Sequence, residues 1–513
     1  MNKKNAKQVI GGATLSYILI ILNAIYGLVL TPFILSSIGD VEYGVYRTIG
    51  SLSSSLMVID LGLGATVTRY IAKFISENRE DKIPNFMAII LLETSVIIIM
   101  LSIISLILYL KIPEIYSQTF STEQIILAQR LFILLCINMG CTILENVING
   151  TITGCNDFLF GNGIKLLQLI VKILLIILLL RVFPSSIALV SINLLLTMVG
   201  LFIEILWAYK RHNIHVRYEK WDSSLFSESF VYTLLMFASS VINQVNSNLD
   251  NVVIGAVIGA SAVTVYSMGL TIYAMFEQLS TSISGVMLPS MIDTLAENNG
   301  LQKAEKLVIR VGRVQFALLG ATLAAFIILG QEFIRLWLGT GFEDVYAITL
   351  ILMIPSVFSL SVNVCLSILR AKNLLGFRTI VLLLTTFANA IITYFGTKAF
   401  GYFAACIGTS FSLIVGVILI MNLYYHKKFG FDMIDVYRKI FSKIWIAILF
   451  ACGIIFISSR IINGSWFAFI INAIIFCCFY ALFLFRFGLN DKEKYEIKSI
   501  IKKGRCVRYF EEK

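Results

Sequence analysis

Long apolar stretches separated by short polar segments run through the whole chain. A helix that crosses the apolar core of a bilayer needs roughly 20 mainly apolar residues. Fourteen stretches meet this requirement, and the two weakest, 126–150 and 158–181, carry charged residues. The stretches are 9–37, 44–66, 84–109, 126–150, 158–181, 185–208, 226–257, 262–289, 311–334, 346–369, 377–399, 401–425, 441–459 and 465–487. The pattern predicts an all-α polytopic membrane protein with 14 transmembrane helices, because a membrane barrel would show short alternating segments.

The connecting segments predict the orientation of these helices. Lys and Arg concentrate in the cytoplasmic loops of membrane proteins. With the N-terminus placed inside, the cytoplasmic segments hold 32 of the 41 basic residues and the outer loops hold five. We therefore expect a multi-pass protein with both termini in the cytoplasm.

The composition agrees with a membrane protein and excludes other classes. Hydrophobic residues make up 58% of the chain and charged residues 14%, whereas a soluble domain carries about 25% charged residues. The apolar excess also excludes a disordered chain. The net charge of +11 follows from the cytoplasmic bias, with a basic tail facing anionic lipid. No nucleic-acid partner is needed to explain it.

A weak internal repeat predicts two related halves. Ile38-Gly39 is followed after five residues by Val45-Tyr46, and Ile258-Gly259 is followed after five residues by Val265-Tyr266. The offset of 220 residues corresponds to six spans, and transporters are often built from such repeats. The predicted plan has two six-helix lobes and two additional helices. Its parts are the N-lobe at 1–208, a cytoplasmic linker at 209–225, the C-lobe at 226–425, the last two helices at 426–488 and a basic cytoplasmic tail at 489–513.

Four basic residues remain inside or at the ends of the spans, all in the first half: Arg47, Arg130, Lys165 and Lys172. Charges within a bilayer are costly and usually face a cavity or a partner. Arg forks and Lys point charges bind phosphates well, so these residues predict a cationic cavity for an anionic headgroup. The alternatives are snorkelling of Arg47 and Arg130 and structural ion pairs of Glu145 with Lys165 or Glu93 with Lys172.

Four acidic residues in the spans are candidates for ion coupling or gating: Asp60, Glu145, Asp250 and Glu277. Alternatively, Asp60 marks a helix break before Gly62, Glu145 is a structural partner, and Asp250 bonds to neighbouring Asn side chains. We expect no metal site, no cofactor and no catalytic residue. The three histidines all lie in predicted cytoplasmic segments, and no triad or phosphate-cradling glycine loop is apparent.

Several motifs resemble the Wzx-type oligosaccharide flippases of the multidrug/oligosaccharidyl-lipid/polysaccharide exporter superfamily. Together they touch most of residues 10–440. They are Glu42–Arg47, Ile59–Gly64, Arg69–Lys73, Asn246–Gly255, Val265–Ser267, Leu279–Thr281, Leu288-Pro289, Leu336–Gly339 with Phe342 and Tyr346, Ile368–Asn373, and Tyr424–Lys428. One departure is the loop Gly154–Phe158, which has no basic residue where relatives often have one.

The resemblance implies a flippase in a bacterial plasma membrane. It would move an undecaprenyl-diphosphate-linked oligosaccharide repeat unit from the inner to the outer leaflet by alternating access, for capsule or exopolysaccharide biosynthesis. The cationic cavity would hold the diphosphate, and an ion gradient would drive transport. Its partners would be the lipid-linked oligosaccharide and membrane lipids, with a polysaccharide polymerase and glycosyltransferases as candidate protein partners.

Two rival functions stay open. An ion-coupled multidrug/cation antiporter of the same superfamily would favour buried carboxylates, and Asp60, Asp250 and Glu277 keep this reading open. A membrane polysaccharide polymerase or glycosyltransferase would need catalytic groups outside the membrane. The outer loops hold only scattered acidic residues, which argues against an enzyme.

Overall fold

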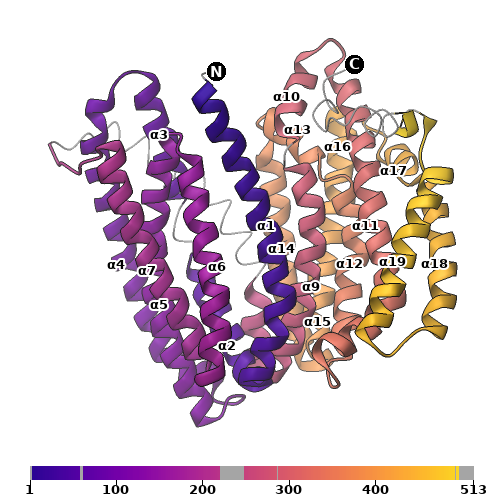
Figure 1. Cartoon of the computed structure of the whole chain (residues 1–513), viewed down its shortest axis with the longest axis horizontal. Helices are drawn as coiled ribbons and strands as arrows, with labels where there is room; N and C mark the ends of the chain where they lie inside the picture. Colours follow the sequence, from indigo (N-terminus) through magenta and orange to yellow (C-terminus); the bar gives the residue numbers. More distant parts are fainter. Residues whose placement is uncertain (1–2, 58–61, 220–247, 286, 492, 496–513) are drawn as a thin grey trace. The chain divides into compact units, whose positions relative to one another are not determined.

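The part of the chain that the computed structural model describes is helical throughout and contains no strand (Figure 1). It comprises residues 3–57, 62–219, 248–285, 287–491 and 493–495. The helices are α1 (Lys3–Ile38), α2 (Asp40–Leu56), α3 (Leu63–Ser76), η2 (Glu80–Lys82), α4 (Ile83–Tyr116), α5 (Thr122–Gly154), α6 (Phe158–Val182), α7 (Ser186–His212), a helical segment at 248–257, α9 (Ala260–Ser284), α10 (Leu288–Ala296), α11 (Gly300–Leu338), α12 (Asp344–Ser361), α13 (Cys365–Ala371), α14 (Leu375–Phe400), α15 (Phe403–Phe411), η3 (Ser412–Ile420), α16 (Met421–Phe429), α17 (Met433–Phe441), α18 (Ile444–Ile461), α19 (Trp466–Phe483) and η4 (Leu484–Gly488).

Eleven helices of the described part are long and apolar enough to cross a membrane. In ten of them, at most 39% of the most apolar window is buried inside the structure, and in Asp344–Ser361 the share is 61%. Helices suit lipid because each satisfies its own backbone hydrogen bonds. Caps define several ends. At α5, for example, the Ser121 and Gln124 side chains form a reciprocal capping box. The chain is therefore a multi-pass helical membrane protein, as the apolar pattern predicts.

Three of the fourteen predicted spans are not among these eleven helices, so the count of 14 stays a prediction. The span 44–66 is not one helix, because α2 ends at Leu56 and α3 begins after Gly62, which has a φ of 67°. The span 226–257 lies mostly outside the described residues. The span 262–289 corresponds to α9, which is long enough but more polar, with Ser267, Thr271 and Glu277 along it.

The chain forms two compact units. Unit 1 comprises Met1–Thr264 and Tyr394–Tyr402, and unit 2 comprises Val265–Thr393 and Phe403–Lys513. The lobe boundaries drawn from the sequence repeat stay a prediction, because they are defined by sequence similarity and not by packing.

In unit 1, α5 is the central helix and contacts α2, α3, α4, α6 and α7, while α1 packs along α6. Two apolar cores, one around Phe86 and Met87 and one around Tyr116 and Phe132, hold these helices together.

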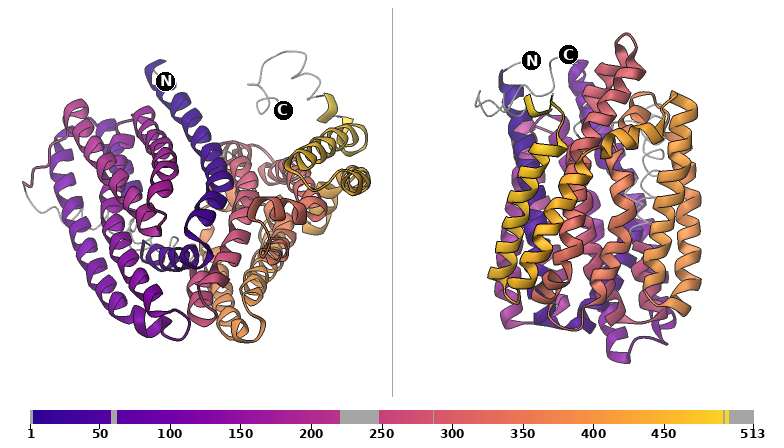
Figure 2. Two further views of the ribbon diagram at one scale, coloured as in Figure 1. Left: turned by 60° about the horizontal axis from the view of Figure 1, so that its bottom comes forward. Right: turned by 90° about the vertical axis from the view of Figure 1, so that its right-hand side faces the viewer.

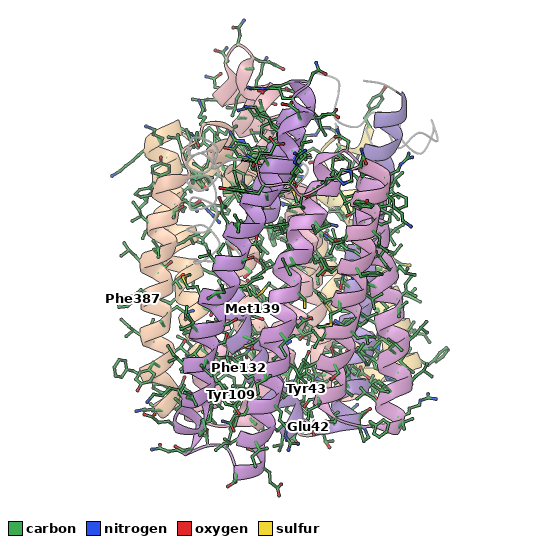
Figure 3. All side chains as sticks on the ribbon, turned by 90° about the vertical axis from the view of Figure 1, so that its left-hand side faces the viewer. Glu42, Tyr43, Tyr109, Phe132, Met139 and Phe387 are labelled. Carbon is green, nitrogen blue, oxygen red and sulfur yellow. The ribbon has the colours of Figure 1, made fainter. Side chains whose placement is uncertain are left out.

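A group of hydrogen bonds joins the beginning of α2 to the beginning of α7. Glu42 Oε1 accepts hydrogen bonds from Ser185 Oγ at 3.1 Å, from Ser186 N at 2.5 Å and from Ser186 Oγ at 2.7 Å. Glu42 and Tyr43 lie at the same end of unit 1 as Tyr109 (Figure 3). The hydrogen bonds of the Glu42 carboxylate therefore hold the first turn of α2, which precedes Arg47, against α7.

In unit 2, α11 is the central helix and contacts α10, α12, α17, α18 and α19. The last two long helices, α18 and α19, lie side by side (Figure 2). They pack on α11 through an apolar cluster that includes Ala451, Ile455 and Phe476.

Candidate functional site

The four basic residues predicted to line a cavity lie on three helices of unit 1. Arg47 is on α2, Arg130 is on α5, and Lys165 and Lys172 are on α6. The two lysines are seven residues apart and so share one face of α6. Lys172 and Arg47 are half-buried, whereas Lys165 and Arg130 are exposed.

Lys172 on α6 lies against the ring of Tyr26 on α1, and α2, which carries Arg47, packs against the same helix α1. Lys172 Nζ lies 5.2 Å from the centre of the Tyr26 ring. This geometry follows from the packing of α1 against both α2 and α6. Two of the four predicted cationic residues thus lie on helices that pack against α1.

At least one donor of these two residues is unpaired among the residues that the structure describes. Arg47 Nε is buried and has no hydrogen-bond partner among the described residues. Lys172 is held by a cation–π contact, which leaves its N–H groups able to donate. A buried donor without an acceptor costs about 1–3 kcal/mol, and a bound anion would recover that free energy. The Arg47 guanidinium and the Lys172 ammonium are therefore each suited to binding an anion.

Lys165 belongs to a separate polar chain in unit 1. Its Nζ donates to Asn149 Oδ1 at 3.2 Å, and Asn149 Nδ2 donates to Glu204 Oε1 at 2.7 Å. Glu204 is fully buried, and its Oε2 has no hydrogen-bond partner among the described residues. Asn149 thus bridges an exposed lysine to a buried carboxylate, which favours a structural role for Lys165.

Glu145 lies beside this chain and is bonded to an amide. Its Oε1 accepts from Gln168 Nε2 at 2.9 Å, and the same amide donates to the Leu196 carbonyl at 3.2 Å. A Cβ at Gly200 would lie 1.9 Å from Gln168 Nε2, so the glycine makes room for this amide against α7. The predicted pair of Glu145 with Lys165 is replaced by amide contacts, although the Lys165 charge still acts on both carboxylates.

The remaining predicted site residues are dispersed. Arg130 is about 22 Å from Glu145 along α5, given 1.5 Å per residue. Asp60 lies outside the described residues. Asp250 is 3% exposed, in the helical segment whose next residue, Asn251, donates to Ser51 Oγ at 2.9 Å. Glu277 is exposed on α9 in unit 2.

Sequence reasoning missed Tyr26, Asn149, Gln168 and Glu204. Glu204 carried a usable signal, since it is a carboxylate inside the predicted span 185–208, as Glu145 is in its own span. The other three are common residues, and only packing reveals their role. Among the described residues, no group of three or more His, Cys, Asp or Glu side chains is arranged to hold a metal ion.

Comparisons with known proteins identify a protein family and several solved structures that this chain resembles. A family model described as "Polysaccharide biosynthesis protein" matches residues 9–295. No curated protein matches the chain.

Several solved structures share the fold. The lipid II flippase MurJ in an inward closed conformation is 16% identical, with a TM-score of 0.67, over 92% of this chain and 98% of that protein. An inward-facing multidrug resistance MATE family transporter of the MOP superfamily is 14% identical, with a TM-score of 0.58, over 80% of this chain and 98% of that one. A MOP superfamily transporter from Pyrococcus furiosus is 15% identical, with a TM-score of 0.51, over 82% of this chain and 95% of that one. At these identities the likeness establishes the fold alone.

Proposed function

This chain belongs to the polysaccharide biosynthesis protein family, and from that premise we propose that it is a flippase for a lipid-linked oligosaccharide. Its cargo is an undecaprenyl-diphosphate-linked repeat unit, which it moves from the inner to the outer leaflet of a bacterial plasma membrane. The product feeds capsule or exopolysaccharide biosynthesis. Both termini are cytoplasmic, and the protein is a transporter and not an enzyme.

Two half-buried cations of unit 1 support this proposal: Lys172, which lies against Tyr26, and Arg47, whose Nε has no hydrogen-bond partner among the described residues. Two cationic side chains can bind the two phosphates of a diphosphate. Arg47 provides a planar guanidinium with several N–H donors, and Lys172 provides a compact ammonium. The site lies among helices of unit 1 that are apolar on their outer faces, so the headgroup is bound while the lipid tail stays in the membrane.

The fold supports the same function. MurJ, which shares the fold, is described as a lipid II flippase. The proposed mechanism is alternating access, in which two helical lobes open the headgroup site first to one side of the membrane and then to the other. In it, Arg47 and Lys172 hold the diphosphate, and the carboxylates Glu145, Asp60, Asp250 and Glu277 are candidates for ion coupling or gating.

The test is flipping of a fluorescent undecaprenyl-diphosphate oligosaccharide in proteoliposomes. Lys172→Gln and Arg47→Gln are each expected to slow flipping about 10-fold or more, because a hydrogen bond to a charged group contributes about 1.5–3 kcal/mol. The control is Lys111→Gln, which removes one positive charge from an exposed side chain paired with Glu114. Normal flipping by both site variants would contradict the proposed diphosphate site.

An ion-coupled multidrug/cation antiporter is the second candidate, favoured by the buried carboxylate of Glu204 and by the MATE fold neighbours. An antiporter would export a cationic dye, and this export would depend on a carboxylate of unit 1. We expect no such efflux from cells that express the protein. The antiporter would be established instead by two results together. The native protein would export the dye but flip no lipid-linked oligosaccharide, and Glu204→Gln would abolish the export.

A further inference from the structure

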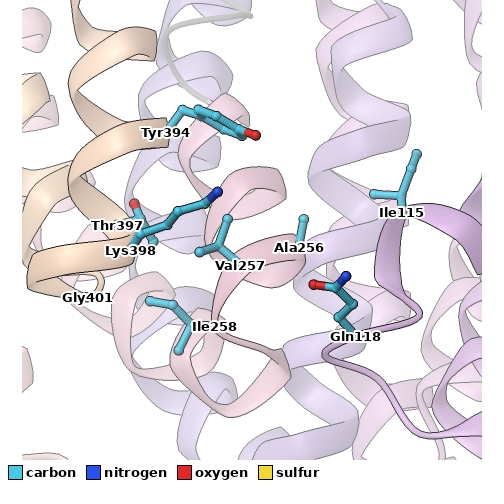
Figure 4. A pocket seen from close by; sticks show the side chains of 9 residues that line it. All are labelled: Ile115, Gln118, Ala256, Val257, Ile258, Tyr394, Thr397, Lys398 and Gly401. Carbon is cyan, nitrogen blue, oxygen red and sulfur yellow. The ribbon is translucent and has the colours of Figure 1, made fainter.

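A polar pocket lies within unit 1, and its lining includes neither Arg47 nor Lys172. It has a volume of about 750 Å³ and is lined by Ile115, Gln118, Ala256, Val257, Ile258, Tyr394, Thr397, Lys398 and Gly401 (Figure 4). Sites for small ligands typically measure about 300–1,000 Å³. The pocket is therefore large enough for a ligand, and none of the roles above uses it.

Three separate segments build the pocket, and each lies where a helix leads into a connection that the charge distribution places outside the cell. They are the end of α4 with the residues after it, the end of the helical segment 248–257, and the last turn of α14. In the predicted topology, the pocket lies at the outer face. It lies at the side where a flipped headgroup would leave.

The wall formed by residues 115–120 is rigid. Tyr116 and Phe120 are buried, and their rings stack at 4.7 Å. Thr119 Oγ1 donates to the Gly255 carbonyl at 2.9 Å, which ties this wall to the helical segment 248–257. Gln118 is exposed between these anchors, so its amide is presented by a fixed backbone.

The opposite wall presents a cation. Gly401, with a φ of 62°, ends α14 and donates its N–H to the Thr397 carbonyl at 3.1 Å, which places Lys398 in the last turn. Lys398 Nζ lies 5.4 Å from the centre of the Tyr394 ring. This cation–π contact contributes about 0.5–1 kcal/mol at an exposed site and limits the positions of the ammonium.

Together these groups match an anionic sugar. The ammonium recognises a carboxylate or phosphate substituent, the Gln118 amide offers both a donor and an acceptor for hydroxyls, and the apolar floor of Ala256 and Val257 suits the C–H face of a sugar ring. We infer that this pocket is an outer subsite for an acidic sugar of the cargo, an inference that rests on the proposed function.

A simpler role for Lys398 is to complement the C-terminal end of the α14 dipole. That role needs a positive charge but no ligand. It predicts that Lys398→Gln changes stability and leaves sugar binding as in the native protein. Measuring binding therefore separates the two roles.

The experiment uses the full-length protein in lipid nanodiscs and measures sugar binding by saturation-transfer NMR. The probes are methyl β-D-glucuronide, glucose 1-phosphate and neutral methyl β-D-glucoside. We expect at least one anionic probe to bind 10-fold or more tightly than the neutral one. The anionic probe that wins identifies the substituent. Lys398→Gln should abolish this preference, whereas Lys398→Arg and the distant control Lys111→Gln should keep it.

Equal binding of anionic and neutral probes by the native protein would overturn the subsite, and so would an unchanged preference in Lys398→Gln. Neither result bears on flipping by the native protein, which is measured separately in proteoliposomes. A native protein that flips no lipid-linked oligosaccharide would overturn the proposed function, whatever the pocket binds.

Discussion

At the residue scale, the most unusual side chain is Glu204. It is fully buried, and only one of its two oxygens has a hydrogen-bond partner among the described residues, namely Asn149 Nδ2. An unsatisfied buried polar group costs free energy unless it serves a purpose. Glu204 is therefore the carboxylate of unit 1 whose removal tells most about the polar chain that it shares with Asn149 and Lys165.

Two substitutions at Glu204 should differ in stability. Glu204→Gln keeps an oxygen that accepts from Asn149, so we expect a change within about 1 kcal/mol. Glu204→Ala leaves the Asn149 amide and a cavity behind, so we expect a loss of about 1–3 kcal/mol. Thermal unfolding in detergent measures both. If the two variants unfold at the same temperature, the bond to Asn149 contributes little.

At the element scale, one arginine fastens the end of unit 2 to its central helix. Arg313 on α11 is 5% exposed and donates to both carboxylate oxygens of Glu493, at 2.7 and 3.1 Å. It also donates to the carbonyls of Lys439, Ser442 and Gly488 at 2.9, 3.1 and 2.9 Å. Lys439 and Ser442 precede α18, Gly488 ends η4 and Glu493 follows it, so one guanidinium anchors both ends of the last helical hairpin.

From the sequence, Arg313 is predicted only to be one of the basic residues on the cytoplasmic side. Its fork geometry, which Lys lacks, explains why an arginine serves this position. The acceptors are 126 to 180 residues away in sequence, a separation that no local pattern reveals.

Loss of this clamp should destabilise the hairpin. Arg313→Ala leaves the partly buried Glu493 carboxylate without its cation, which costs about 3–5 kcal/mol, and Arg313→Lys should recover only part of it. Limited proteolysis of the membrane-embedded protein is expected to cleave near residues 488–495 faster in Arg313→Ala. The control is Lys306→Ala, an exposed position on the same helix. Equal cleavage in both variants would argue against the clamp.

Another finding at this scale is the interruption between α2 and α3. A continuous apolar stretch from 44 to 66 predicts one helix, but Gly62 takes up a left-handed conformation that L-residues disfavour. Apolarity reports which segments avoid water, and it does not report where a helix breaks. This is why the hydropathy pattern joined two helices into one span.

At the scale of the whole molecule, two compact units of helices share their fold with MurJ and with MATE transporters. The topology of the segment between α7 and α9 remains the decisive prediction. It lies mostly outside the described residues, and the count of fourteen depends on it.

Reporter fusions test that segment directly. A reporter fused after Lys210 is expected to read cytoplasmic, and one fused after Gly259 is expected to read external, because the apolar stretch 226–257 should cross once. The same side for both reporters would contradict the crossing and the even number of spans.

The site was predicted only in part. The cost of burying charge singled out Arg47 and Lys172 in the sequence, and in the structure both are half-buried, with Lys172 against Tyr26. The same argument grouped Lys165 with them, yet Lys165 bonds to Asn149, and Arg130 lies far along α5. A buried charge in a sequence signals a partner, but it does not say whether that partner is a ligand or a neighbouring helix.

The sequence by itself determined the membrane class, the helical fold and a short list of charged candidates, because transfer of side chains into lipid depends on composition along the chain. Only the tertiary structure decided which candidates meet, how Arg313 holds the last hairpin, and that Gln118 and Lys398 share a pocket. Those outcomes depend on contacts between residues far apart in sequence, and such contacts arise from helix packing rather than from hydropathy.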